Sequence, residues 1–433
     1  MASAHSVMMR RTAALGDPLR NKIKMSISTN VHGRSVAILY DTAYPFTYGG
    51  GQRRLYEVGR RMADLGWNVH WYPLKAWDGD CTLFRDGILY QGLRGRTNLF
   101  GTDGKRAYAE ALSYGRAVLT ARVDFASYDL VWCGQWPLFH ILALIARLVP
   151  WRTCLLVDWW EVWGRYWLTY AGLPGLGGWF LETALTKTLG RIGHVITDSE
   201  VGRNRLLAVG VLSDALTVIP NGVDLAGLAA DGPAEGSSDL VYLGRLKDHK
   251  NVDHIVRALA LLNRRDSTRL RLDLIGDGPE RVRLEELAQT LGVTDQVTFH
   301  GTVETYRANA LLKRSKVFVH ASTQQCGGSM NLLEANACGL PVVCYRHPMG
   351  IDPGHVLEGE TGLMVSPAEP ESLADGISAM LRLVAAKDVR NRCLAHAKSF
   401  DWSFTAEHYC ELINNLLSES PARRSIPRAE LQK

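Results

Sequence analysis

Two cations that follow an apolar run near the middle of the chain have the spacing expected of a diphosphate-binding site. Val241 to Leu243 resembles the end of a strand, Gly244 and Arg245 come next, and Lys250 lies at the end of the following turn. A departing diphosphate gains negative charge as its bond breaks, so fixed cations stabilise the transition state more than the ground state. The alternative is a pair of solvated surface charges.

A glycine-rich turn further along supplies the second part of this predicted site. Gly327 and Gly328 permit close backbone approach, and Ser329 opens a segment that we expect to be helical and to carry Glu334. Free amide groups at a helix start bind phosphate without a metal, and a carboxylate accepts hydrogen bonds from ribose hydroxyls. The pattern therefore predicts a site for a nucleotide diphosphate, with a solvent-facing Glu334 as the alternative.

Two other glycine turns are predicted to complete this site, which would bind the nucleotide diphosphate together with an attached sugar, called the donor below. The turn 49–51 suits a mobile loop that closes over a sugar and its phosphate, and a plain loop is the alternative. The turn 276–279, Gly-Asp-Gly-Pro, suits a backbone approach to the base, although an ordinary connection fits as well. With Arg245 and Lys250 as the catalytic cations, the residues predicted to bind the donor are Gly50, Gly51, Gly244, Gly278, Gly327, Gly328, Ser329, Met330, Asn331 and Glu334.

The composition excludes several classes of protein. A length of 433 residues exceeds one ordinary core and indicates two or three domains, of which two is the economical count. An apolar fraction of 46%, a charged fraction of 21% and a net charge of +5 are typical of a folded soluble protein and do not indicate nucleic-acid binding. The most apolar stretch, Leu138 to Trp151, is too short to span a bilayer. The eight cysteines lack zinc-type spacing, so we expect reduced thiols, no metal site and a cytoplasmic protein.

Apolar runs alternate with segments of helical period from Val36 onward, which predicts an α/β protein with two doubly wound parallel sheets. We expect a Rossmann-like acceptor-binding domain at 32–221 and a Rossmann-like nucleotide-sugar-binding domain at 222–396, facing each other across a cleft. A helix at 397–419 is expected to cross back to the first domain, and residues 1–31 and 420–433 are expected to be a disordered leader and tail. The predicted strands are Val36–Asp41, Trp67–Tyr72, Leu130–Cys133, Cys154–Val157, His194–Thr197, Leu216–Ile219, Leu240–Leu243, Leu270–Ile275, Val297–His300, Val317–His320 and Pro341–Tyr345.

With these motifs in place, the chain resembles the retaining glycosyltransferases of the GT-B fold, in the group of the glycogen, sucrose and phosphatidylinositol mannoside synthases. The resemblance covers about Val36 to Leu417. The motifs that carry it are Gly49-Gly50-Gly51, Ile219-Pro220-Asn221-Gly222-Val223-Asp224, Gly244-Arg245 with Lys250-Asn251, Gly276-Asp277-Gly278-Pro279, and Leu333-Glu334-Ala335-Asn336-Ala337-Cys338-Gly339-Leu340-Pro341-Val342-Val343.

The resemblance implies a division of roles. Arg245 and Lys250 hold the diphosphate of a UDP-sugar or GDP-sugar, and Glu334 holds its ribose. Transfer is metal-independent, needs no cofactor and retains the anomeric configuration, and the departing phosphate itself takes the proton of the acceptor. Two positions depart from the family: Cys326 stands where the family usually has a glutamate that touches the donor sugar, and Trp160 stands where it usually has a histidine.

A run of tryptophans suggests the kind of acceptor. Seven of the twelve fall between Trp132 and Trp167, and aromatic faces bind sugars and cations, although a dense apolar core is the alternative. We therefore expect a small aromatic or cationic acceptor, such as an aminocyclitol in antibiotic biosynthesis. The residues expected to line the sugar and acceptor pocket are Cys326, Trp136, Asp158, Trp159, Trp160, Glu161 and Trp163.

Three alternatives stay open at this point. One is transfer to sulfur or nitrogen, for example to a betaine thiol such as ergothioneine in a lincosamide-type pathway. The others are a non-catalytic sugar-nucleotide-binding protein and another nucleotide-diphosphate enzyme, such as an epimerase. A homodimer is possible, and neither a nucleic-acid partner nor a transmembrane segment is expected.

Overall fold

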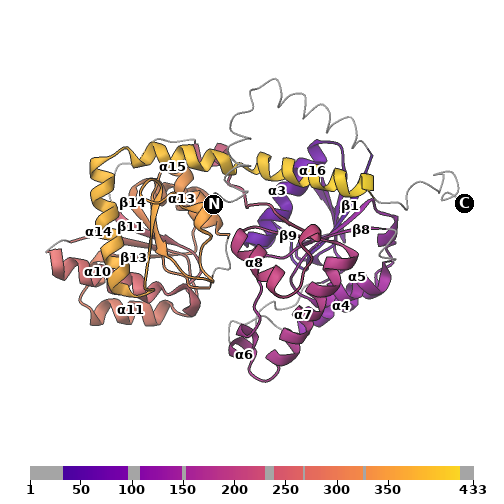
Figure 1. The fold of residues 1–433 in the computed structure, drawn as a ribbon, viewed down its shortest axis with the longest axis horizontal. Coiled ribbons are helices and arrows are strands. Elements are labelled where there is room, and N and C mark those ends of the chain that lie inside the picture. The colour runs from indigo at the N-terminus through magenta and orange to yellow at the C-terminus, as the bar shows by residue number, and fades with distance from the viewer. Residues whose placement is uncertain are drawn as a thin grey trace, which may run out of the picture. The chain divides into compact units, whose positions relative to one another are not determined.

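A computed structural model describes residues 33–95, 108–148, 153–229, 238–266, 269–324 and 328–419. They form two compact units (Figure 1). Among the described residues, the N-terminal unit comprises 33–198, 202–219 and 403–419, and the C-terminal unit comprises 199–201 and 220–402. The expected leader at 1–31 and tail at 420–433 lie outside the described residues, as do Trp151, Cys326 and Gly327.

The N-terminal unit is built on an eight-stranded sheet with the strand order β10-β9-β8-β7-β1-β2-β5-β4. All neighbours in this sheet pair in parallel except β4 and β5. The predicted parallel order is therefore confirmed for six predicted strands. The strands are β1 (Ser35–Leu39), β2 (Asn68–Trp71), β4 (Thr82–Arg85), β5 (Ile88–Gln91), β7 (Leu130–Gly134), β8 (Cys154–Asp158), β9 (His194–Thr197) and β10 (Leu216–Val218), with β3 (Leu74–Lys75) and β6 (Arg94–Gly95) as a separate pair.

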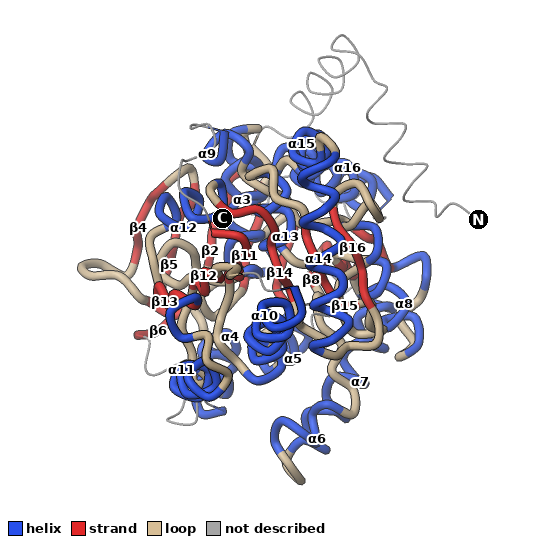
Figure 2. The backbone as a smooth tube through the Cα atoms, turned by 90° about the vertical axis from the view of Figure 1, so that its left-hand side faces the viewer, coloured by secondary structure: helices blue, strands red, loops and turns tan. Residues whose placement is uncertain are grey.

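Helices cover both faces of this sheet (Figures 1 and 2). Alternate residues of β1 divide between the two faces: Val36 and Ile38 pack with α3 and α16, whereas Ala37 and Leu39 pack with α4, α5 and α7. Burial on both faces explains why the strands are continuous apolar runs. The helices are α3 (Gly50–Asp64), α4 (Tyr108–Thr120), α5 (Phe139–Arg147), α6 (Tyr166–Ala171), α7 (Gly175–Ile192), α8 (Glu200–Ala208) and α16 (Trp402–Glu419).

The antiparallel edge of the N-terminal sheet was not predicted. Strands β4 and β5 are joined by Asp86 and Gly87, which both have positive φ, at 52° and 77°. A two-residue Asp-Gly loop of this kind forms tight hairpins, because its backbone twist matches that of the flanking strands. The hairpin ends the sheet on that side with β4, whose side chains are mostly exposed.

The C-terminal unit contains a six-stranded parallel sheet with the order β13-β12-β11-β14-β15-β16. Five of these strands were predicted, and the edge strand β16 was not. The strands are β11 (Ser238–Leu243), β12 (Leu272–Ile275), β13 (Val297–Gly301), β14 (Ser315–His320), β15 (Val342–Tyr345) and β16 (Gly362–Val365).

Two apolar cores lie on the two faces of this second sheet. Leu240 and Tyr242 of β11 pack with α10 and α14 on one face, and Val241 packs with α12 and α13 on the other. The helices are α9 (Leu225–Ala229), α10 (Val252–Asp266), α11 (Arg281–Thr290), α12 (Thr305–Lys313), α13 (Met330–Ala337), α14 (Pro370–Ala386) and α15 (Val389–Ala397). None of the helices in the described part of the chain has both the length and the apolarity that crossing a bilayer requires.

The last helix returns to the N-terminal sheet, as expected, although it begins at Trp402 instead of residue 397. A buried polar network fixes it there. Tyr409 Oη on α16 donates to Asp158 Oδ1 at the end of β8 at 2.5 Å, and Arg54 Nε on α3 donates to Tyr409 Oη at 2.8 Å. Trp132 Nε1 donates to Asp158 Oδ2 at 3.0 Å, and Arg54 Nη2 donates to the carbonyl of Ile219 at 2.7 Å.

This network joins elements that are far apart in the sequence. The Arg54 guanidinium lies 3.5 Å from the Asp158 carboxylate, and both side chains are fully buried. A buried ion pair of this kind is tolerated only when hydrogen bonds satisfy its remaining polar atoms. The network therefore ties α3, β8 and α16 together in one arrangement.

Arg54→Met tests this role. The substitution leaves the buried Asp158 carboxylate without its cationic partner, so we expect the free energy of unfolding to fall by about 3–5 kcal/mol. Tyr409→Phe removes only hydrogen bonds and should cost about 1–3 kcal/mol. The control is Arg60→Met on the same helix, a partly exposed residue paired with Glu57, which should change stability by less than about 1 kcal/mol. Urea unfolding measures all three, and an Arg54→Met midpoint like that of Arg60→Met would contradict the assignment.

Candidate functional site

The strand order of the C-terminal sheet identifies where a ligand fits best in that unit. The first strand, β11, has β12 on one side and β14 on the other, so the connections leaving β11 and β14 run in opposite directions. A crevice opens at such a switch point, outside the carboxyl ends of the strands. The described segments there are 244–251 after β11, and 321–324 and 328–329 between β14 and α13.

Close backbone packing shapes the loop after β11. Gly276 has φ of 127°, and a Cβ at this position would lie 2.0 Å from the carbonyl oxygen of Gly244. A Cβ at Gly278 would lie 2.2 Å from the carbonyl oxygen of Leu246. The amide of Leu246 also donates to the carbonyl of Asp277 at 2.9 Å. The turn 276–279 therefore needs its glycines to support the loop that carries Arg245.

Hydrogen bonds join the two loops at the switch point. Asn251 has φ of 48°, in the left-handed region that asparagine tolerates, and its Nδ2 donates to the carbonyl of Ala321 at 3.0 Å and to Thr323 Oγ1 at 3.2 Å. Ser322 Oγ donates to the carbonyl of His249 at 3.1 Å. The loop with the two predicted cations is thus fixed against the loop that leads to α13.

The predicted cations lie at this switch point and create a positive environment. Arg245 is exposed, and Lys247 and Lys250 are half-buried. Burial, followed by the charges of Lys250, Lys247 and Arg245, lowers the pKa of His249 to about 4. The imidazole is therefore neutral at pH 7, because a further positive charge is disfavoured there.

Helix α13 presents the other predicted donor residues. Ser329 is buried at its N-cap, and the Ser329 side chain makes no capping hydrogen bond, which leaves the first amides of α13 without that partner. Asn331 Nδ2 donates to the carbonyl of Leu243 at 2.6 Å, so α13 is held against the end of β11. Glu334 lies three residues further on, on the same side of the helix as Asn331, and is half-buried. Gly244 and Glu334 thus flank one region of the C-terminal unit.

In the N-terminal unit the corresponding switch point lies between β1 and β7. Trp160 packs there on two glycines: a Cβ at Gly51 would lie 2.6 Å from its ring, and a Cβ at Gly134 would lie 3.0 Å from it. The Tyr40 ring meets Trp160 edge-on at a centroid distance of 5.9 Å. Gly50 and Gly51 form the first turn of α3, so the predicted glycine turn is the start of a helix whose first residues contact Trp160.

Gln135 fixes the segment 159–161 in this place. Its Oε1 accepts hydrogen bonds from the amides of Trp160 and Glu161, both at 2.8 Å, and its Nε2 donates to the carbonyl of Glu161 at 2.6 Å. The Glu161 carboxylate accepts from Trp163 Nε1 at 2.8 Å, and the Trp163 ring lies 4.8 Å from the Trp136 ring. Trp136, Trp160, Glu161 and Trp163 are therefore brought together in one half-buried region.

The structure places two predicted pocket residues elsewhere. Asp158 is fully buried in the network with Arg54 and Tyr409, and Trp159 is fully buried in an apolar core, with its Nε1 donating to the carbonyl of Glu161. Neither side chain has exposed surface to offer an acceptor, because the strand end at β8 directs both of them into the interior. Cys326 lies outside the described residues. The seven described cysteines are free thiols.

The roles of Gln135, His249 and Asn251 were not predicted from the sequence, although Asn251 belongs to one of the motifs that carry the resemblance. Gln135 directly follows β7, so its position at a carboxyl strand end was a usable signal. Asn251 and His249 follow β11 in the same way. Their partners, Ala321, Ser322 and Thr323, come from a distant loop, and that pairing follows only from the strand order.

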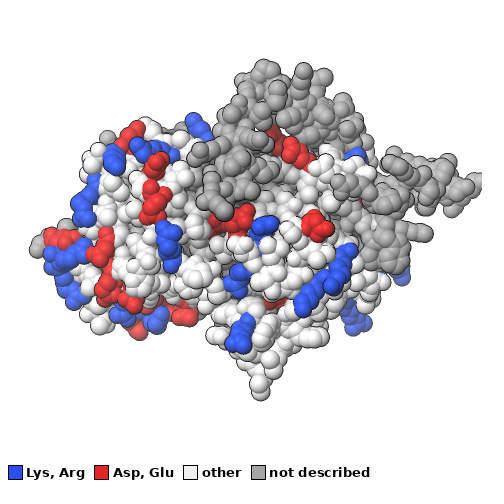
Figure 3. Space-filling model, in the orientation of Figure 1, with Lys and Arg blue, Asp and Glu red and all other residues white. Residues whose placement is uncertain are grey.

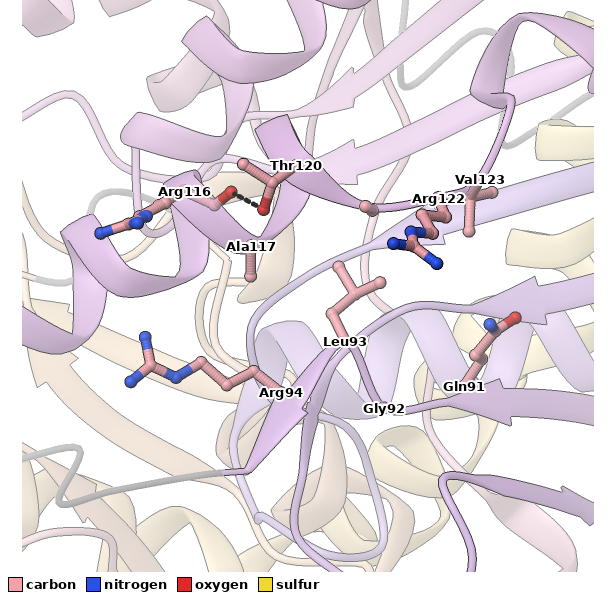
Figure 4. Close-up of a pocket in the computed structure, with 10 residues that line it drawn as sticks. Gln91, Gly92, Leu93, Arg94, Arg116, Ala117, Thr120, Arg122 and Val123 are labelled. Carbon is pink, nitrogen blue, oxygen red and sulfur yellow. Dashed lines mark hydrogen bonds between the residues drawn. The ribbon is translucent and has the colours of Figure 1, made fainter.

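A separate pocket of about 350 Å³ lies in the N-terminal unit between the ends of β5 and α4. Arg94, Arg116 and Arg122 line it, and Figure 4 shows Arg94 and Arg116 on one side and Arg122 on the other. Arg94 Nη1 donates to Ser113 Oγ at 2.7 Å. The positive charges around this pocket are thus separated into two groups, on opposite sides of it. In the described parts of the chain no group of three or more His, Cys, Asp or Glu side chains has the arrangement of a metal site.

Comparison with known proteins agrees with this architecture. Residues 48–226 match the family described as Glycosyltransferase Family 4, and residues 229–399 match Glycosyl transferases group 1. The chain is 32% identical over 256 residues to a D-inositol 3-phosphate glycosyltransferase of Nocardia farcinica, covering 53% of this chain and 54% of that protein. It is 30% identical over 260 residues to a GDP-mannose-dependent alpha-(1-6)-phosphatidylinositol monomannoside mannosyltransferase of Mycolicibacterium smegmatis, covering 55% and 67%. The first relative is therefore matched over about half of its length.

Solved structures share the fold at lower identity. A sucrose-phosphate synthase of Thermosynechococcus elongatus superposes with a TM-score of 0.70 and 20% identity over 89% of this chain and 99% of that chain. The Anabaena protein HepE, solved with UDP and glucose, gives a TM-score of 0.65 and 17% identity over 88% and 100%. At these identities the likeness concerns the fold.

The titration of His249 tests whether an anion binds beside its cations. A bound diphosphate offsets the charges of Lys250 and Arg245, so the pKa of His249 should rise from about 4 when UDP or GDP is added. Imidazole proton shifts in NMR, followed against pH, measure this change. The control is His396 on α15, whose pKa burial also lowers and whose titration should stay the same. Saturation with nucleotide that leaves His249 unmoved would exclude this location.

Proposed function

Because this chain belongs to the GT-B glycosyltransferases, with a family 4 N-terminal half and a group 1 C-terminal half, we propose that it transfers a sugar from a nucleotide-diphosphate sugar to an acceptor. The observation that carries the proposal is the positive switch point of the C-terminal unit, where Arg245, Lys247 and Lys250 lie on a loop that hydrogen bonds fix beside the segment leading to α13. A cluster of cations held beside the N-terminus of a helix suits the binding of a diphosphate.

The residues around the switch point each bind a different part of the donor. Arg245 and Lys250 neutralise the diphosphate, the first amides of α13 bind its oxygens, and Glu334 accepts hydrogen bonds from the ribose. The nucleotide is UDP or GDP: one relative is GDP-mannose-dependent by its name, and one structural neighbour was solved with UDP. Gly244 and Gly278 allow the backbone to approach because neither carries a side chain.

The same residues act on the chemistry of transfer. When the bond from the sugar to the diphosphate breaks, negative charge accumulates on the leaving oxygen, and the Arg245 and Lys250 cations stabilise that charge more than they stabilise the intact donor. This arrangement supplies the electrostatic role without a metal. Transfer retains the anomeric configuration, and the leaving phosphate accepts the proton of the acceptor.

The acceptor binds to the N-terminal unit in this proposal. Trp136, Trp160 and Trp163 form a half-buried aromatic region with the Glu161 carboxylate at its edge. Aromatic faces attract cations through the ring quadrupole, and a carboxylate adds to that attraction. We therefore expect a small acceptor that presents an aromatic or positively charged group, of the kind made in natural-product pathways.

Substitution of the two cations tests the donor site. Arg245→Gln and Lys250→Gln should each lower kcat by about 100-fold, because removing one preorganised group that stabilises transition-state charge has about this effect. Glu334→Gln should mainly raise the KM for the donor. The control is Arg283→Gln, an exposed arginine of α11 in the same unit, which should leave both constants unchanged. Donor hydrolysis and transfer assays measure these constants.

Two outcomes of these assays would contradict the assignment. Wild-type turnover in Arg245→Gln and Lys250→Gln would show that the diphosphate lies elsewhere. Loss of wild-type activity on treatment with EDTA, with recovery on addition of Mg²⁺, would show that a metal performs the role given to the cations.

The acceptor site is tested separately with paired acceptors that differ only in charge. Trp163→Leu should lower the affinity for a cationic acceptor by about fivefold, which is the size of a partly exposed cation–π contact. The affinity for the neutral isostere of that acceptor should fall by a smaller factor. Isothermal titration with each acceptor measures the difference. Trp77→Leu, a partly buried tryptophan of the same unit, is the control. Equal losses for both acceptors would contradict a cationic acceptor.

A further inference from the structure

The hairpin formed by α6 and α7 exposes several large apolar side chains of the N-terminal unit. It projects from the body of that unit in both ribbon views (Figures 1 and 2). No charged residue lies between Arg165 and Glu182 in the sequence. Leu173 at the turn is 83% exposed, Leu176 is 51% exposed, and Phe180 is 78% exposed. Large apolar side chains ordinarily lie in a core. The exposure of three of them in one contiguous segment therefore indicates an interaction surface.

The hairpin is a packed structure whose apolar tip is directed outward. A Cβ at Gly175 would lie 2.0 Å from the backbone oxygen of Trp167, and a Cβ at Gly178 would lie 2.5 Å from the Trp167 ring. The two helices therefore cross at glycines, with Trp167 buried between them. The Arg165 guanidinium lies over the Trp179 ring at 6.0 Å and joins the start of α6 to α7. Because the interior of the hairpin is already filled, the side chains of Leu173 and Phe180 cannot turn inward.

The exposed charges within the hairpin itself all have one sign. Arg165, Lys187 and Arg191 are exposed between residues 164 and 193, and the only acidic residue in that range, Glu182, is buried. The Glu182 carboxylate accepts from the amides of Trp163 and Gly164 at 3.0 and 2.7 Å and so holds the base of the hairpin. In the space-filling view the tip of the hairpin, at the lower edge of the molecule, is uncharged (Figure 3).

We propose that this hairpin docks the protein on an anionic lipid surface. Leu173, Leu176 and Phe180 enter the acyl boundary, and Arg165, stacked on Trp179 beside them, meets the negative headgroups. Tryptophan side chains favour the depth at which one end of the ring is apolar and the other is wet, and the half-buried Trp179 directly precedes the exposed Phe180. Such docking lies in the interface and needs no spanning helix.

A second copy of the chain fits this surface less well. In a symmetric dimer the same patch faces its own copy, so the positive charges of the two hairpins would be brought together and would oppose the contact. An anionic bilayer instead complements both the cations and the apolar tip. The charge pattern therefore favours lipid over self-association.

Vesicle sedimentation of the full chain tests the proposal. The wild-type protein should bind vesicles of phosphatidylcholine mixed with phosphatidylglycerol more tightly than vesicles of phosphatidylcholine alone. The double variant Leu173→Ser with Phe180→Ser should bind the mixed vesicles at least about 100-fold more weakly, because several buried carbons are lost from each side chain. Arg165→Gln should weaken binding about fivefold on the mixed vesicles and little on the neutral ones.

The matched control is Phe84→Ser on β4, which removes a phenylalanine that is 70% exposed in the same unit but outside the hairpin. It should bind as the wild type does. UDP and GDP calorimetry on each variant reports folding and donor binding independently, so a failure of lipid docking is distinguishable from a failure of the proposed function.

Three results would overturn the proposal. The wild type would fail to sediment with mixed vesicles, or the hairpin variant would sediment with them as the wild type does. In the third, the wild type would bind neither kind of vesicle. Sedimentation velocity would instead show a wild-type dimer and a monomeric Leu173→Ser, Phe180→Ser variant, and the surface would then belong to a second copy.

Discussion

The C-terminal unit depends on a backbone contact that leaves no room for side chains. The turn after β12 lies against the loop after β11, and a Cβ at Gly276 would fall 2.0 Å from the carbonyl of Gly244. This contact determines where the chain goes as it leaves β11, and therefore where Arg245 and Lys250 lie. Asn251 then joins the same loop to the one that leads into α13. Positive charge and the start of a helix are thus held near one another at this switch point, which is the combination that an anionic ligand needs.

The N-terminal unit uses its charges differently. Two of its deeply buried acidic groups, Asp158 and Glu182, have structural partners: Asp158 is bound by Arg54, Tyr409 and Trp132, and Glu182 is bound by the amides at the base of the α6–α7 hairpin. Burial raises the pKa of both carboxyls, and their hydrogen-bond donors oppose that rise. What remains near the switch point of this unit is aromatic surface with one accessible carboxylate, Glu161. Shape and stacking, more than acid–base chemistry, are what this surface offers a substrate.

The sequence was sufficient to predict the alternation of strands and helices, because strands buried on both faces are continuous apolar runs. It also indicated the loops at the carboxyl strand ends, including Arg245, Lys250 and the start of α13. The β4–β5 hairpin was missed although Asp86-Gly87 was a usable signal, and β16 is a short edge strand. The environment of Asp158 could not be predicted, because its partners Arg54 and Tyr409 are separated from each other by 355 residues in the chain. Burial at that position is decided by the tertiary fold and not by the neighbouring sequence.

The most direct test of this account is a crystal structure of the chain soaked with UDP and, separately, with GDP. We expect one nucleotide to bind with its diphosphate within hydrogen-bond distance of Arg245, Lys250 and the first amides of α13, and with its ribose hydroxyls on Glu334. Density for a nucleotide at another place in the C-terminal unit, or no nucleotide bound at a concentration that saturates binding in solution, would contradict the account.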